Sequence, residues 1–327
     1  MYKIAYTSNH TDGIEYVLET LTGDYEVVVR DAHCGNDEEK LIEQCRDADV
    51  ALCDFEPFTR HVLESLPKLK LLQFTGVGFN ECDVQAATEL GIAVCNCPTY
   101  CINEVADHVM SMMLAINRRL FQFSKMVKED HVWASTSFTD MRPFNELTCG
   151  LVGFGNIARS VAKRMLAFGA RVVATDPFVS AEVMAEYGVE KLELDDFLAQ
   201  ADYISIHLQA TPSTIDYFNA ETFSKCKDGV VLINASRGVV VNEGDLIDAL
   251  RSGKVGFAGL DVLYDEHPDL EHNPLASMDN VILTPHAAFY SSSARRNGRR
   301  EAARSIMNYM EGRYDQAPIR NGVFGGK

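Results

Sequence analysis

The chain has 327 residues, of which 46% are hydrophobic and 24% charged, and its net charge at pH 7 is −17. This length suits two domains with separate cores, and the composition excludes a largely disordered chain. The acidic charge argues against nucleic acid as a partner, because a polyanion binder needs a basic surface. No apolar run approaches the roughly 18 residues that cross a bilayer, and Met1-Tyr2-Lys3-Ile4-Ala5-Tyr6 lacks the apolar core of a signal peptide. We therefore expect a cytoplasmic protein with no membrane partner.

The nine cysteines favour reduced thiols over a disulfide framework, because their number is odd and the chain is long and unsecreted. No metal site is predicted. Cys95, Cys97 and Cys101 lack a second cluster at zinc spacing, and His267 and His272 lack a third ligand. The basic run Arg295-Arg296-Asn297-Gly298-Arg299-Arg300 is interpreted as a solvated helix face.

Short apolar runs alternate with amphipathic stretches over the first hundred residues, which predicts βαβ units and a parallel sheet. The expected strands are 3–7, 26–29, 50–53, 69–74 and 92–95, and the expected helices are 38–45, 60–65 and 83–90. After Pro98, apolar residues at helical spacing predict one long helix over 103–120. Residues 121–147, which contain the only tryptophan, Trp133, are predicted to form an arm or a packing extension.

A second alternating set follows and again predicts a parallel α/β domain. Its expected strands are 148–152, 171–175, 203–206, 230–234, 256–261 and 281–283. A final helix is expected over 292–309.

A glycine-rich motif follows the strand 148–152 and opens a helix expected over 157–168. It reads Gly153-Phe154-Gly155-Asn156-Ile157-Ala158. The first glycine permits a tight turn, the second lets the backbone approach a pyrophosphate, and the small third residue lets the helix pack on the strand. The free N–H groups of the helix N-terminus then favour phosphates. We therefore assign Gly153, Phe154, Gly155, Asn156 and Ile157 to a dinucleotide site.

The next strand ends at Asp176, 21 residues beyond Gly155. A carboxylate at this place accepts hydrogen bonds from the hydroxyls of an adenosine ribose and repels a 2′-phosphate. The residues that follow, Pro177-Phe178-Val179, supply no arginine to hold such a phosphate. The predicted cofactor is therefore NAD in preference to NADP.

Three further polar clusters follow strands of the second set. They are Ala235-Ser236-Arg237-Gly238, Asp261-Val262-Leu263-Tyr264-Asp265-Glu266-His267-Pro268 and Thr284-Pro285-His286-Ala287-Ala288. Ligands of doubly wound sheets bind outside the carboxyl ends of the strands. One arginine, one glutamate and one histidine are thus expected to converge near the nicotinamide.

With these motifs, the chain resembles the D-2-hydroxyacid dehydrogenase family over nearly its whole length. Thr75-Gly76-Val77-Gly78-Phe79-Asn80 and Asn103-Glu104-Val105-Ala106-Asp107-His108 contribute to the likeness. The C-terminal-binding-protein-like and phosphoglycerate-dehydrogenase-like branches are the most similar. The resemblance implies an α/β fold of two Rossmann-like, doubly wound parallel-sheet domains with the active site in a cleft between them. It places a substrate-binding domain at 1–101 plus 289–327 and an NAD-binding domain at 102–288, and it implies a homodimer through the nucleotide domain.

The resemblance also implies a role for each residue. Arg237 would bind the carboxylate of a small 2-hydroxy or 2-oxo acid, as its planar fork allows. His286 would exchange a proton with the substrate oxygen while the cofactor carries the hydride, and Glu266 would orient His286 and favour its charged form. Val77 and Gly78 would hold the carboxylate from the other domain. The remaining cofactor-binding residues would be His207, Ala235, Ser236 and Asp261, besides Arg237 and His286.

Some alternatives stay open. Asp265 could take the place of Glu266, and His207 could be a core histidine. The stretch 51–57, Ala-Leu-Cys-Asp-Phe-Glu-Pro, is acidic where phosphoglycerate enzymes carry an arginine. The chain also ends soon after its last helix, without room for a regulatory domain. We therefore expect a non-phosphorylated substrate. The rival functions are an NAD-responsive, corepressor-like binding protein and an enzyme acting on formate or phosphite.

Overall fold

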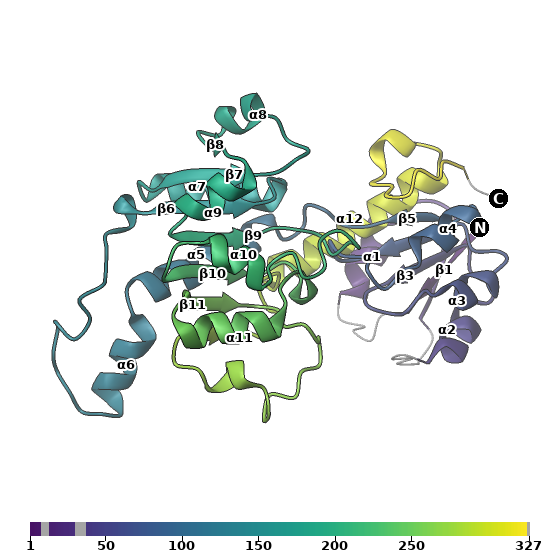
Figure 1. Cartoon of the computed structure of the whole chain (residues 1–327). Helices are drawn as coiled ribbons and strands as arrows, with labels where there is room; N and C mark the ends of the chain where they lie inside the picture. Colours follow the sequence, from purple (N-terminus) through teal and green to yellow (C-terminus); the bar gives the residue numbers. More distant parts are fainter. Residues whose placement is uncertain (8–12, 30–36, 326–327) are drawn as a thin grey trace. The chain divides into compact units, whose positions relative to one another are not determined.

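The structure is a computed structural model that describes residues 1–7, 13–29 and 37–325. The chain divides into two compact units, Met1–Cys101 with Tyr290–Lys327 and Ile102–Phe289 (Figure 1). Each unit is an α/β layer structure and is described by itself. Within the described ranges, none of the helices is both long and apolar enough to span a bilayer.

The first unit contains a five-stranded sheet in which every neighbouring pair is parallel. Its strands are β1 (Tyr2–Tyr6), β2 (Tyr25–Val29), β3 (Val50–Cys53), β4 (Leu71–Phe74) and β5 (Ala93–Cys95). These five strands confirm the first predicted set. Their order in the sheet is β2-β1-β3-β4-β5. The chain reverses its direction of travel across the sheet between β1 and β3. Ligands bind at such a switch point in open α/β sheets.

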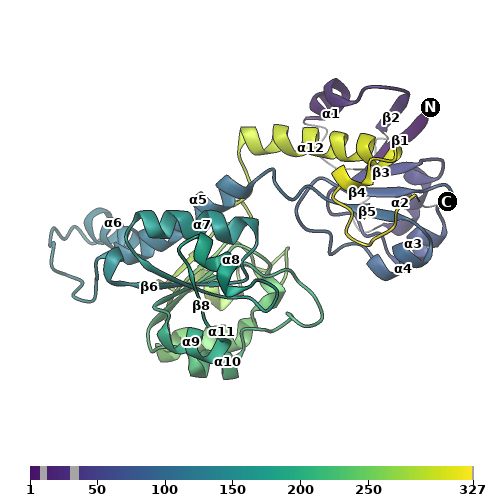
Figure 2. The same ribbon diagram turned by 90° about the horizontal axis from the view of Figure 1, so that it is seen from above.

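Helices cover both faces of this sheet (Figure 2). They are α1 (Ile14–Thr20), α2 (Glu38–Cys45), α3 (Arg60–Glu64), α4 (Val84–Glu89) and α12 (Ser292–Met310). The buried residues of α12, among them Ala302 and Ile306, pack with Ile4 and Tyr6 of β1 in one core cluster. The helices α2, α3 and α4 contribute to a second core cluster on the other face.

The second unit contains a seven-stranded parallel sheet in the order β12-β11-β10-β9-β6-β7-β8. The strands are β6 (Thr148–Val152), β7 (Arg171–Thr175), β8 (Glu190–Lys191), β9 (Tyr203–Ile206), β10 (Val230–Asn234), β11 (Val255–Leu260) and β12 (Val281–Leu283). The six predicted strands are confirmed. Sequence analysis missed β8, whose two residues are too few to form a pattern. The switch point of this sheet lies between β6 and β9.

The helices of the second unit also lie on both faces of its sheet, α5 and α7 on one and α9, α10 and α11 on the other (Figure 2). Their bounds are α5 (Ile102–Asn117), α6 (Leu120–Lys128), α7 (Asn156–Ala167), α8 (Ala181–Glu186), α9 (Leu194–Gln200), α10 (Ala220–Lys225) and α11 (Glu243–Ser252). Asn and Ser side chains cap α8, α10 and α11 by accepting backbone N–H groups of the first turn. The helix α7 has Gly155 at its N-cap position and therefore lacks such a side-chain cap.

The single long helix predicted over 103–120 is wrong at its end. The helix α5 stops at Asn117, and α6 begins at Leu120 after a turn in which Arg119 has a φ of 51°. This left-handed conformation breaks the helix. The Arg119 guanidinium lies 3.7 Å from the centre of the Phe257 ring and forms an ion pair with Asp140, and these contacts hold the turn. Such contacts between distant residues leave no periodic signal.

The eight cysteines in the part of the chain that the structure describes are buried and form no disulfide. Cys34 lies outside the described residues. Burial raises the pKa of Cys95 and of Cys149 to about 12 in each case, so both thiols stay protonated at neutral pH.

Candidate active site

The turn after β6 depends on Gly153. Its φ is 87°, and a Cβ at this position would lie 2.7 Å from the carbonyl oxygen of His207, which follows β9. Only glycine combines this conformation with so close an approach. Gly155, by contrast, has an extended backbone, and a Cβ there would meet nothing within 4 Å. The space above Gly155 is therefore open to a ligand, as the dinucleotide motif requires.

The N-terminus of α7 faces this open space. Gly155 and Asn156 are exposed and Ile157 is half-buried. No side chain caps the helix, so its first N–H groups can bind an anion such as a pyrophosphate. Ala158 is buried against the strand, as the motif predicts. Phe154 contributes differently, because its side chain is buried and its N–H group donates to Asp176 Oδ2 at 2.8 Å.

Asp176 lies directly after β7 and holds the turn together. Besides the contact with Phe154, its Oδ1 accepts the N–H group of Phe178 at 2.8 Å. A carboxylate oxygen can accept more than one hydrogen bond, so ribose hydroxyls can still donate to Asp176. The Phe178 side chain is 95% exposed beside it. These features fit the adenosine half of a dinucleotide.

The turn after β10 presents Ala235, Ser236 and Arg237, all half-buried. Asn234, the last residue of the strand, shapes this turn: its Oδ1 accepts the N–H and hydroxyl groups of Ser236 at 3.0 and 2.8 Å, and its Nδ2 donates to the carbonyl oxygen of Arg237 at 2.9 Å. The Arg237 Nη1 donates to the Ser236 carbonyl oxygen at 2.7 Å. These contacts hold Arg237 at the carboxyl edge of the sheet.

His286 and Glu266 form a close pair near the end of β12. The Nδ1 atom of His286 lies 2.8 Å from Glu266 Oε2. The hydrogen bond with His286 lowers the pKa of Glu266, an effect that burial opposes and that the charges of His286 and Arg237 reinforce. Glu266 is therefore a carboxylate at neutral pH. Asp265, the alternative to Glu266, instead accepts the backbone N–H group of His267.

The turn that carries His286 is held by Asp261, which is 1% exposed. Its Oδ1 accepts the hydroxyl of Thr284 at 2.5 Å and the N–H group of Ala287 at 2.9 Å, and its Oδ2 accepts the N–H group of Ala288 at 2.9 Å. His286 itself has a φ of 50°, in the left-handed region, and its N–H group donates to the Asp261 carbonyl oxygen at 2.7 Å. Asp261 thus positions the turn, and its predicted contact with the cofactor stays a prediction.

His207 contributes its backbone and its ring in different places. The carbonyl oxygen lies against Gly153, while Nε2 of the ring lies 3.0 Å from the hydroxyl of Ser205. Burial lowers the pKa of His207 to about 4, so the ring is neutral at neutral pH. His207 is therefore at the nucleotide turn, as predicted, and also has the character of a core histidine.

In the first unit, Val77 and Gly78 lie in a half-buried loop after β4. The two residues that follow β5 hold this loop. The Cys97 N–H group donates to the Gly76 carbonyl oxygen at 2.9 Å, and Asn96 Nδ2 donates to the Val77 carbonyl oxygen at 2.6 Å. Arg320, near the end of the chain, orients the Asn96 amide by donating to its Oδ1 at 2.6 Å.

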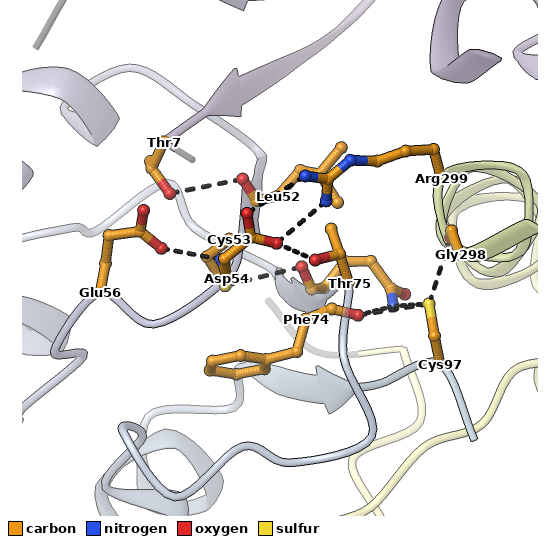
Figure 3. A network of polar contacts seen from close by, with 11 residues as sticks. Thr7, Leu52, Cys53, Asp54, Glu56, Phe74, Thr75, Cys97, Gly298 and Arg299 are labelled. Carbon is orange, nitrogen blue, oxygen red and sulfur yellow. Dashed lines mark hydrogen bonds and ion pairs between the residues drawn. The ribbon is translucent and has the colours of Figure 1, made fainter. Parts of the chain in front are cut away.

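A buried ion pair lies at the same edge of the first sheet (Figure 3). Arg299 of α12 donates to both oxygens of Asp54, at 2.9 and 3.2 Å, and the Thr75 hydroxyl also donates to Asp54. Burial alone would lower the pKa of Arg299, but Asp54 raises it. The prediction of a solvated basic face is therefore wrong at Arg299, whose side chain is only 10% exposed. Its partner is 245 residues away, so no local pattern reveals it.

The stretch 51–57 is less negative than its sequence indicates. Asp54 is neutralised by Arg299, and Glu56 is 4% exposed and accepts the Asp54 N–H group at 2.8 Å. Burial, together with the nearby charge of Asp54, raises the pKa of Glu56. An aspartate after a strand cannot be recognised as paired from sequence alone.

Sequence analysis also missed Asn234 and Thr284 as structural members of the site. Each is a polar residue at the end of, or next to, an apolar strand, and this position was the available signal. Thr284 belongs to the motif Thr284-Pro285-His286-Ala287-Ala288, but only the structure shows its contact with Asp261.

The two motif glycines should fail in different ways. We expect Gly153→Ala to lower the thermal stability of the apoprotein, because its Cβ would collide with the His207 carbonyl at a positive φ. Gly155→Ala should leave apoprotein stability unchanged and weaken NADH binding, because its Cβ occupies only the space above the helix N-terminus. Thermal unfolding without cofactor and NADH fluorescence titration would measure both. Equal effects of the two variants on apoprotein stability would contradict this assignment.

His207 should make stability depend on pH. Its pKa of about 4 in the folded protein lies below the ordinary histidine value of 6.5, so the unfolded chain binds more protons between these values. Stability contributed by the neutral ring is thus lost as pH falls from 6.5 to 4, with a slope of at most about 1.4 kcal/mol per pH unit. We expect His207→Gln to flatten urea-unfolding free energies over this range. An unaltered slope in the variant would show that His207 is not the group responsible.

Comparisons with known proteins identify the family of this chain. Residues 110–288 match the family model of the D-isomer specific 2-hydroxyacid dehydrogenase NAD binding domain. The D-3-phosphoglycerate dehydrogenase of Mycobacterium bovis is 38% identical over 292 residues, which cover 88% of this chain and 54% of that protein. This chain therefore spans about half the length of that relative. The hydroxypyruvate reductase of Blautia hydrogenotrophica is 34% identical over 293 residues, covering 88% of this chain and 90% of that protein.

Among solved structures, the D-lactate dehydrogenase of Aquifex aeolicus in complex with NAD and lactic acid matches with a TM-score of 0.85 and 30% identity. The match covers 98% of this chain and 99% of that one. The family model, the relatives and this structure point to the same group of proteins. The chain belongs to the D-isomer specific 2-hydroxyacid dehydrogenase family.

Proposed function

We propose that this protein is an NAD-dependent oxidoreductase that interconverts a D-2-hydroxy acid and the corresponding 2-oxo acid. The observation that carries the proposal is the His286–Glu266 pair, with 2.8 Å between Nδ1 and Oε2, on the same sheet edge as the dinucleotide turn. A histidine oriented by a carboxylate is suited to general acid–base catalysis. The bound cofactor supplies or accepts the hydride.

In this proposal His286 holds the proton that the reaction needs. Glu266 accepts a hydrogen bond from Nδ1 and stays ionised because its pKa is lowered, so its negative charge lies beside the imidazole that exchanges the proton. The Nε2 atom would then donate its proton to the oxo oxygen during reduction, or take the hydroxyl proton during oxidation. The His286 ring has little freedom to rotate, because Glu266 holds its Nδ1 atom and Asp261 holds the backbone turn that carries it.

Arg237 would bind the substrate carboxylate with its planar guanidinium, and its charge would also polarise the oxo group. For Val77 and Gly78 of the first unit, the proposed role is that their N–H groups bind a carboxylate. The support for this second role is the fixed loop geometry, since Asn96 and Cys97 hold the carbonyl oxygens of Val77 and Gly76.

We propose a substrate without a phosphate group. Arg299 is already neutralised by Asp54, so this arginine is not suited to serve as a phosphate ligand. Glu56, which accepts the Asp54 N–H group in the network of Figure 3, would add negative charge if ionised. The relative named D-3-phosphoglycerate dehydrogenase makes 3-phosphohydroxypyruvate the essential comparison substrate.

We propose NAD in preference to NADP, because the Asp176 carboxylate would repel a 2′-phosphate on the ribose. A cytoplasmic location is proposed as well, since the buried cysteines of the described residues form no disulfide, which suits a reducing compartment.

Activity should be visible as loss of NADH absorbance with a panel of 2-oxo acids: glyoxylate, hydroxypyruvate, pyruvate, branched-chain and aromatic acids, and 3-phosphohydroxypyruvate. We expect turnover of a non-phosphorylated member, with NADPH a poorer cofactor than NADH. His286→Ala should lower kcat by about 100- to 10,000-fold, the usual contribution of a general acid. The matched control is His272→Ala, because the His272 side chain is 78% exposed and forms an exposed ion pair with Asp269.

Two outcomes would contradict the proposed enzyme. Equal activity of His286→Ala and the wild type would show that His286 is not the general acid. Tight NADH binding without turnover of any member would instead support the NAD-responsive binding protein.

We also propose that the protein is a homodimer and that the predicted arm over residues 121–147, together with the start of α6, lies in the interface. The helix α6 has no buried residue, and this region exposes 56% of Leu120, 57% of Phe121 and 91% of Trp133. Large apolar side chains exposed in this way favour association. A second copy of this chain is the occupant that the family resemblance implies.

The dimer is testable because Trp133 is the only tryptophan. We expect the mass of a dimer by light scattering and protection of tryptophan fluorescence from iodide. Phe121→Asp should shift the mass to that of a monomer and expose the tryptophan, whereas Phe178→Asp, a change at a 95% exposed phenylalanine of the nucleotide site, should keep the dimer. A wild-type monomer with a freely quenched tryptophan would contradict this proposal.

A further inference from the structure

His108 belongs to the motif Asn103–His108, which the proposed reaction leaves without a role. It lies on α5, and its side chain is 24% exposed. Its Nε2 lies 2.9 Å from the hydroxyl oxygen of Thr284 and 3.5 Å from Asp261 Oδ1. The histidine thus reaches across from a helix to the turn that carries His286.

The chemistry fixes the direction of these hydrogen bonds. Thr284 has a single hydroxyl proton, which it donates to the Asp261 carboxylate over 2.5 Å. The hydroxyl oxygen can then act toward His108 only as an acceptor, so Nε2 of His108 carries a proton and donates it. The result is a directed chain from His108 through Thr284 to Asp261. Successive hydrogen bonds of this kind strengthen one another.

The chain ends on the backbone of the proposed proton donor. Asp261 also accepts the N–H groups of Ala287 and Ala288, and its own carbonyl oxygen accepts the N–H group of His286. The left-handed φ of His286 is an unfavourable conformation that the surroundings must impose. A loss of alignment in Thr284 or Asp261 would therefore move the His286 ring relative to Glu266.

We propose that His108 is a positioning residue for the reaction, acting through Thr284 and Asp261 on the geometry of His286. The proposal rests on the proposed function, because it concerns the same proton transfer. His108 touches neither reacting group in this arrangement. Its contribution is to keep the proton donor aligned, and misplacement of a catalytic group by about 1 Å can cost on the order of 100-fold in rate.

The test compares four variants of the full chain: His108→Leu and Thr284→Val, which remove a hydrogen-bonding group, and His108→Gln and Thr284→Ser, which keep one. We expect the first two to lower kcat by about 10- to 100-fold while KM for the oxo acid and Kd for NADH change by less than about threefold. The other two should recover most of the lost kcat. Thermal unfolding of each variant shows whether it is folded.

Wild-type kcat in His108→Leu and in Thr284→Val would overturn the proposal. A parallel loss of kcat, NADH affinity and stability, without recovery in His108→Gln and Thr284→Ser, would also overturn it, because it would show a purely structural role.

A second measurement separates this inference from the proposed function. If the wild type turns over none of the oxo acids, the proposed function fails, but the positioning of His286 can still be observed. The ring signals of His286 in a histidine-labelled NMR spectrum, assigned with His286→Ala, should move in His108→Leu and stay in place in His108→Gln. Identical His286 signals in the wild type and His108→Leu would overturn the positioning role.

Discussion

The arrangement of the candidate site depends on the buried carboxylate of Asp261. Three donors from the turn after β12 converge on it, namely the Thr284 hydroxyl and the N–H groups of Ala287 and Ala288. A buried carboxylate is costly unless it is fully hydrogen-bonded, and here the turn supplies the donors that it needs. The N–H group of His286, whose backbone is left-handed, donates to the carbonyl oxygen of the same aspartate. Fold stability and the geometry of the proposed proton donor are thereby linked in one interaction.

Sheet topology explains why the remaining groups gather near this turn. In the second unit the chain switches direction between β6 and β9, so the glycine-rich turn and His207 become neighbours although they are far apart in sequence. Arg237 follows β10 and His286 follows β12 on the same parallel sheet, so both lie at its carboxyl edge. The proposed dinucleotide at the switch point and the proposed acid–base pair farther along this edge would suit hydride transfer with coupled proton transfer.

Most of the fold was predictable because its central strands are continuous apolar runs separated by amphipathic stretches. The dinucleotide turn was also predictable, since each glycine has a local physical reason. Features that depend on distant partners were not. The end of α5 depends on contacts of Arg119 with Phe257 and Asp140, and the burial of Arg299 depends on Asp54. Asp261 was recognised as a site residue, but its role in holding the turn requires the positions of backbone N–H groups that no sequence pattern contains.

The most direct test of this account is a crystal structure of the protein with NADH and oxamate, an unreactive analogue of a 2-oxo acid. We expect Nε2 of His286 to lie within hydrogen-bond distance of the oxamate carbonyl oxygen, Arg237 to hold the oxamate carboxylate, and Glu266 to remain on Nδ1. The pyrophosphate should lie on the N-terminus of α7. Oxamate bound away from His286, or a His286 ring turned away from it toward another partner, would contradict the account.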